Sequence, residues 1–198
     1  KPTIFWGSNL KLWRDPLGGL SLYVTTLYWG IGAVMQFAVL LWAQDSLGMT
    51  LKFGAYLQAL VAIGVILGAY MAGRSFKLHS ARQALPWGLW LAVLLPLMVT
   101  ISNLWLAIAL LLCVGVAGGM LLVPMNAVLQ HRGMQVLSSG RSIAVQGFNE
   151  NLSVLLMLAA YSALLALGMS LTYIMLLLAV MLVAGIAPLC LLLWRQFR

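Results

Sequence analysis

Six long apolar runs, separated by short polar or basic connectors, account for most of this 198-residue chain. Each run is near the roughly 20 residues that an α-helix needs to cross the hydrocarbon core of a bilayer. The runs are Leu20–Ala43, Phe53–Gly73, Pro86–Ser102, Leu104–Gln130, Ser142–Leu167 and Leu171–Trp194. Very short connectors follow the third and fifth runs, which is typical of antiparallel helix hairpins. The pattern predicts an all-α membrane protein with six transmembrane helices, whose bundle extends over residues 20–198.

The segment before the first run mixes bases with large apolar side chains. Trp6 and Trp13 accompany Lys11 and Arg14 within residues 1–19. Aromatic and basic side chains together favour the membrane surface, so we expect a cytoplasmic or interfacial linker here. The chain begins with lysine rather than methionine, which favours an interior cut, a processed end or further preceding sequence.

The composition explains why a bilayer is the expected solvent. Hydrophobic residues make up 64% of the chain and charged residues 7%, against roughly half and a quarter in soluble domains. The net charge of +8 could indicate nucleic acid. However, the bases form short clusters between apolar runs and do not line a basic amphipathic face. We therefore interpret them as topology signals and contacts with membrane lipids, and expect no nucleic-acid partner.

The basic residues divide unequally between the two sides of the predicted membrane. Lys52 alone falls in the outer connectors. The other side receives Lys1, Lys11, Arg14, Arg74, Lys77, Arg82, Arg132, Arg141, Arg195 and Arg198. The positive-inside rule then predicts a multi-pass protein of the cell membrane with both termini in the cytoplasm.

Glu150 is the acidic residue that lies well inside an apolar run. It is about nine residues into the fifth run, or roughly 13 Å along a helix. A charge at that depth costs at least a few kcal/mol, so a partner, water or protonation must offset it. Gln146 and Asn149 share its side of the helix, whereas Asn151 points the opposite way and is interpreted as helix packing. The stripe indicates a substrate or proton site; the alternative is a hydrogen-bonded glutamate that locks two helices together.

Polar residues in two other runs extend the candidate site. Trp29 and Gln36 share one face of the first run, where Gln36 could bond a ligand headgroup or a neighbouring helix. Asn126 lies in the fourth run, close to Pro124. The candidate substrate-binding residues are therefore Glu150, Gln146, Asn149, Gln36, Trp29 and Asn126.

Two glycine pairs predict close helix approaches. Gly64 and Gly68 have G-x-x-x-G spacing in the second run, and Gly115 and Gly119 repeat it in the fourth. Small residues at this spacing allow helix backbones to touch in a membrane.

Enzymatic chemistry has no support in the sequence. The histidines, His79 and His131, lie in or beside basic connectors, and no G-x-S-x-G motif or phosphate-binding loop occurs. No residues have metal-ligand spacing. We expect a protein that is not an enzyme and has no metal or cofactor.

Four stretches of the chain resemble bacterial lysophospholipid transporters of the major facilitator superfamily. They are GVAGGMLLVPMNAVLQHRG at 115–133, IAVQGFNENLS at 143–153, LYWGIG at 27–32 and ALVAIGVILG at 59–68. Six helices with both ends on one side form half of that superfamily's architecture. The resemblance covers nearly the whole chain and implies the carboxy-terminal half, helices seven to twelve.

The resemblance implies a flippase for lysophospholipids, mainly lysophosphatidylethanolamine. Such proteins move these lipids across the bacterial inner membrane to the cytoplasmic leaflet, where an acyltransferase–synthetase restores the second chain. The amino-terminal six-helix half of the same transporter would be the other partner. Glu150 matches the family's acidic position in the eleventh helix. Gln36 departs from the family, since some members carry arginine there.

Two other functions remain open on the sequence. One is a proton-coupled major-facilitator carrier of drugs or small solutes, with Glu150 as the proton site. The other is a membrane anchor or assembly module that transports nothing.

Overall fold

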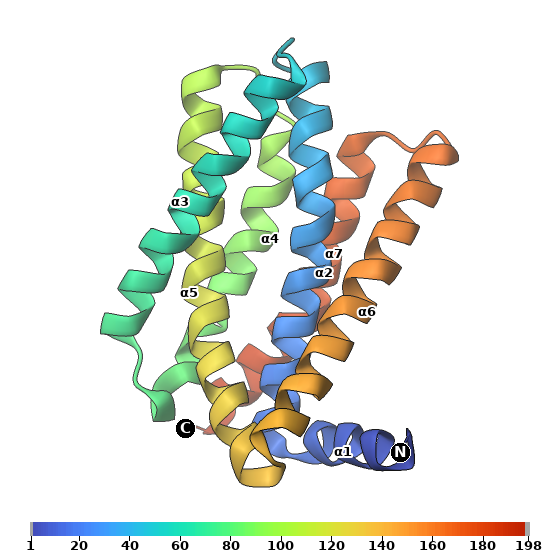
Figure 1. Cartoon of the computed structure of the whole chain (residues 1–198). Helices are drawn as coiled ribbons and strands as arrows, with labels where there is room; N and C mark the ends of the chain where they lie inside the picture. The colour runs from blue at the N-terminus through green and yellow to red at the C-terminus, as the bar shows by residue number, and fades with distance from the viewer. Residues whose placement is uncertain (1, 197–198) are drawn as a thin grey trace.

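The computed structural model describes residues 2–196, and these form seven α-helices and one short 3₁₀ helix with no strand (Figure 1). The elements are α1 (Pro2–Arg14), α2 (Pro16–Asp45), α3 (Leu51–Ser75), η1 (Leu78–Ala84), α4 (Pro86–Met98), α5 (Leu104–Val136), α6 (Ser139–Ala166) and α7 (Leu171–Gln196). Lys1 and Arg198, counted above among the cytoplasmic bases, lie outside the described residues. The predicted all-α architecture is confirmed.

Five of the described helices are long and apolar enough to cross a membrane: α2, α3, α5, α6 and α7. The third predicted run, Pro86–Ser102, differs because α4 has only 13 residues, or about 20 Å. Pro96 inside α4 has no amide hydrogen for the helical ladder, and the helix ends at Met98. In contrast, α5 has 33 residues, or about 50 Å, which exceeds the roughly 30 Å core of a bilayer.

The segment before the bundle is a helix, and it lies across one end of the bundle (Figure 1). This end, formed by α1, η1 and the α5–α6 connection, is called the basic end below. Only Asp15 separates α1 from α2, so the first long helix begins at Pro16 rather than at Leu20. Asp15 caps α2 by accepting a hydrogen bond from the Gly18 amide at 2.7 Å, and a proline suits the first helical position.

Glycines bring α3 and α5 into backbone contact. A Cβ built on Gly64 would lie 2.9 Å from the Cα of Gly115, and one on Gly119 would lie 2.7 Å from the amide nitrogen of Ala69. Gly68 meets the backbone of Val116 in the same way. The close approach predicted from the two glycine pairs is confirmed, and it makes this the most extensive helix contact in the bundle.

The bundle has a buried apolar core, and many large apolar side chains are also exposed on its outer faces. Trp42, Leu111 and Met125 are completely buried in the main core. Ile66 on α3 and Leu155 on α6 are, by contrast, 68% and 65% exposed. Large apolar side chains on the outer helix faces are stable against lipid or against another apolar protein surface, but not against water.

Candidate functional site

Glu150 lies in a small polar cluster to which three helices contribute. The side-chain amide of Gln146, one turn earlier on α6, donates to Glu150 Oε1 at 2.9 Å and to Asn126 Oδ1 on α5 at 3.1 Å. Thr25 on α2 is close to the carboxyl, and its hydroxyl donates to the Leu22 carbonyl at 3.2 Å. The structure therefore brings together three of the predicted residues: Glu150, Gln146 and Asn126.

The partners of Glu150 do not neutralise its charge. The Gln146 amide can orient the carboxylate, but neither it nor the nearby Thr25 hydroxyl carries a positive charge. The residue is partly exposed rather than sealed in the core. A carboxyl in this setting can accept a cationic ligand group or a proton.

Asn149 is next to Glu150 in sequence but bonds in another direction. Its Nδ2 donates to Asn9 Oδ1 at 2.9 Å, and its Oδ1 accepts from Trp13 Nε1 at 3.1 Å. Both partners are on α1. The structure thus places Asn149 at the joint between α1 and α6, apart from the Glu150 cluster.

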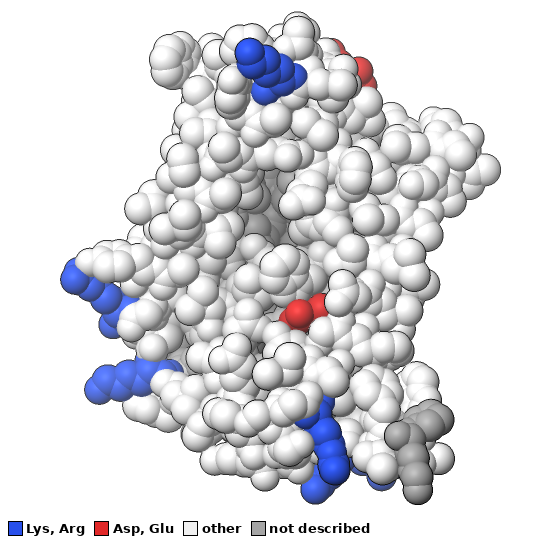
Figure 2. Space-filling view, in the orientation of Figure 1, with Lys and Arg blue, Asp and Glu red and all other residues white. Residues whose placement is uncertain are grey.

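Trp29 and Gln36 line a separate cavity of about 720 Å³, to which α2, α3, α4, α5, α6 and α7 all contribute lining residues. The Gln58 side-chain amide donates to the backbone carbonyl of Gln36 at its wall. Most of the other lining residues are apolar, and they include Val39, Ala62, Val65, Val114, Leu122 and Val154. Figure 2 shows that this face of the molecule is hollowed, with acidic atoms just below the hollow. The predicted residues therefore divide between a polar cluster and an apolar cavity.

Asn151 also lines this cavity, although its position on the helix predicted packing against a neighbour. Its Nδ2 donates to the Gly147 carbonyl of the same helix at 2.7 Å. Val154, one turn after Glu150, lines the cavity as well. Helix α6 therefore carries the polar cluster and the cavity wall within about one turn of each other.

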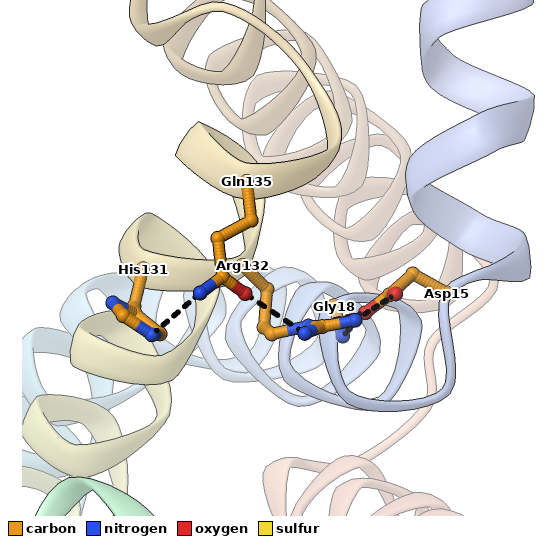
Figure 3. Close-up of polar contacts among 5 residues, drawn as sticks. All are labelled: Asp15, Gly18, His131, Arg132 and Gln135. Atoms are coloured by element: carbon orange, nitrogen blue, oxygen red, sulfur yellow. Dashed lines mark hydrogen bonds and ion pairs between the residues drawn. The ribbon is translucent and has the colours of Figure 1, made fainter.

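A second polar cluster, at the basic end, joins the start of α2 to the end of α5 (Figure 3). Arg132 Nε donates to Asp15 Oδ2 at 3.0 Å and Nη2 donates to Oδ1, which makes a two-pronged ion pair. Arg132 also donates to Gln135 Oε1 at 2.8 Å, and Gln135 contacts His131. We refer to this set as the Asp15–Arg132 cluster.

The electrostatics of Asp15 follow from these contacts. The hydrogen bond from Arg132 lowers the pKa of the Asp15 carboxyl below its ordinary value, and the Gly18 amide acts in the same direction, against the effect of burial. The sequence pattern around Arg132 indicates only a topology signal. The Asp-Pro pair before an apolar run was a visible cap signal, but nothing local indicated a partner 117 residues away.

Long apolar helices with lipid-compatible outer faces and a polar cluster inside define a polytopic helical membrane protein. The chain is 38% identical to lysophospholipid transporter LplT of Pectobacterium carotovorum over 84% of its own length and 41% of the relative. It is also 38% identical to LplT of Serratia proteamaculans, over 80% and 40%. For LplT of Escherichia coli the identity is 37%, over 83% and 42%.

These matches show that the chain is a homologue of the bacterial lysophospholipid transporters, as the sequence resemblance indicated. It spans about two fifths of the length of these relatives, which agrees with a half-length, carboxy-terminal segment. No family model matches the chain, and no solved structure does.

Proposed function

We propose that the full-length protein containing this chain transports lysophospholipids across the bacterial inner membrane. The proposal rests on the lysophospholipid transporters to which the chain is similar. It rests equally on the structure of α6, because this helix carries the polar cluster around Glu150 and also lines an apolar cavity. A lysolipid has one charged headgroup and one acyl chain, and it needs both kinds of surface.

The headgroup would meet the Glu150 cluster. The carboxyl has neutral partners, so the ammonium of an ethanolamine headgroup would supply the missing positive charge. Lysophosphatidylethanolamine is therefore the proposed substrate. Gln146 would hold the carboxyl, and Asn126, which accepts from the same Gln146 amide, would orient it and complete the polar surface.

The acyl chain would occupy the cavity lined by Trp29 and Gln36. Its volume of about 720 Å³ falls within the roughly 300–1,000 Å³ of ordinary ligand pockets. The second wall of the path would come from the amino-terminal half, and rocking of the two halves would expose the site to each leaflet in turn.

In this proposal the basic end faces the cytoplasm. Basic side chains of α1, α3 and α5 are there, and most of the blue atoms in Figure 2 lie toward that end. Lys52 is at the start of α3, which lies at the far end of the bundle (Figure 1). Delivery to the inner leaflet would place the lysolipid where an acyltransferase–synthetase can restore its second chain.

The test is uptake of labelled lysophosphatidylethanolamine by vesicles that contain the full-length protein. Ala62→Trp should fill part of the cavity, and it should slow an 18-carbon lysolipid at least about fivefold more than a 10-carbon one. Ala159→Trp is the matched control, because Ala159 is exposed on α6 and does not line the cavity. Equal slowing of both lipids would remove the cavity from the path, and absence of any lysolipid uptake by the parent would refute transport.

A proton-coupled carrier of small solutes is the second candidate. The observation in its favour is the same lack of a cationic partner at Glu150, which would also suit a proton. A competition assay distinguishes the two candidate functions, because excess lysolipid should not inhibit the uptake of a small solute by a carrier of small solutes.

A further inference from the structure

A cavity of about 550 Å³ opens at the basic end, between α1 and the end of α5. Gly7, Lys11 and Arg14 line it from one face of α1, at spacings of four and three residues. Gln135 lines it from α5. A Cβ built on Gly7 would meet no atom within 4 Å, so there is open space above that part of the helix. None of the residues around Glu150 contributes to this cavity.

The cavity has an excess of positive charge. Its one acidic residue, Asp15, is already paired with Arg132 and caps α2. Lys11 and Arg14 are exposed, and neither forms an ion pair within residues 2–196. Two cationic side chains therefore meet in a cavity whose carboxylate is occupied elsewhere, which favours an anionic ligand.

The surroundings identify the membrane surface as the source of that ligand. Leu10 lines the cavity and is 50% exposed, while Trp6 and Trp13 on the same short helix are 57% and 37% exposed. Exposed tryptophans beside bases are typical of helices at the level of lipid headgroups. Since α1 lies across the end of the bundle (Figure 1), its exposed apolar side chains can rest in the leaflet that borders the basic end.

We propose that this cavity binds the phosphate of an anionic membrane phospholipid, with Lys11 and Arg14 as the cationic contacts and Leu10 beside the acyl region. The lipid would be a resident of the leaflet and not the transported molecule. Basic recesses between helices at the cytoplasmic surface are suited to such headgroups.

The test measures binding rather than transport, so its outcome is independent of the proposed function. Purified full-length protein in neutral detergent is titrated with dihexanoyl phosphatidylglycerol, dihexanoyl phosphatidylcholine and inorganic phosphate. K11Q/R14Q should weaken phosphatidylglycerol binding about tenfold or more. R74Q/K77Q, which removes the same charge at the same end but outside the cavity, should change it less than about twofold. K11R/R14K should restore binding, which separates contact with the lipid from the effect of the bases on folding of α1.

Three results would overturn the proposal. The first is a parent protein that binds the two lipids equally. The second is an equal loss of phosphatidylglycerol affinity in K11Q/R14Q and R74Q/K77Q, which would show that binding depends only on the net charge of this end. The third is inorganic phosphate that displaces phosphatidylglycerol at equal concentration, which would make this a site for free anions.

Discussion

Helix α5 meets its neighbours in two different ways. Against α3 it packs backbone to backbone, through Gly64, Gly115 and Gly119. Towards α6 it presents Asn126, which reaches Gln146 through side chains. The first contact leaves no room for a ligand, whereas the second has unneutralised polar groups beside a cavity. The α3–α5 pair therefore serves as a close-packed support, whereas the α6 side is where the proposed function places the substrate.

The glycine contact should be the more sensitive to added volume. Gly119→Leu would force a side chain into the backbone of α3, so the free energy of unfolding should fall by about 1–3 kcal/mol. Unfolding in detergent, followed by circular dichroism, measures this. Gly147→Leu on α6 is the control, because a Cβ there meets nothing within 4 Å. A Gly119 variant as stable as the parent would mean that α3 and α5 are not in close contact.

The Asp15–Arg132 cluster ties α2 to α5 at the basic end, and it should add a smaller amount to the same support. Asp15→Ala removes both the cap of α2 and the ion pair, and should cost about 1–2 kcal/mol. Asp15→Asn keeps a capping oxygen and loses only the charge, so it should cost about 0.5 kcal/mol. Equal costs for the two variants would show that capping contributes nothing here.

The stabilisation by the Asp15–Arg132 ion pair should decrease only when the pH is lowered. The pKa of Asp15 is lower in the folded protein than its ordinary value, so the stabilisation is complete above the unfolded pKa of about 3.9. It is lost as the pH falls through the folded value. The stability difference between the parent and Asp15→Asn should stay constant from about pH 7 to pH 5 and shrink below about pH 4. A difference that shrinks above pH 5 would contradict the assigned pairing.

Local patterns predicted much of the fold. The apolar runs gave the long helices, and G-x-x-x-G spacing predicted the α3–α5 contact that the structure confirms. The run Pro86–Ser102 was less informative, because apolar residues continue past the point where α4 ends at Met98. The hydrophobicity of a segment predicts whether it is stable in an apolar environment. It does not predict at which residue the helical hydrogen bonds end.

Helical periodicity predicted the part of the candidate site that lies on a single helix. The grouping of Glu150 with Gln146 follows from one turn of helix, and the structure confirms that they bond. The bonds of Asn149 to Trp13 and Asn9 connect residues 136 and 140 apart. No local pattern encodes such pairs, because they depend on where α1 lies after the bundle has formed.

The central claim is that the Glu150 carboxylate receives the substrate's cationic headgroup, and Glu150→Gln tests it most directly. The amide is nearly isosteric and removes a charge from within the membrane, so stability should hold or rise. Initial rates of lysophosphatidylethanolamine uptake into vesicles should fall by about tenfold or more, while Asp45→Asn, an acidic residue at the far end of α2, should transport like the parent. Near-normal uptake by Glu150→Gln, with no change in its dependence on a pH gradient, would contradict the claim and leave Glu150 as a residue that only packs helices.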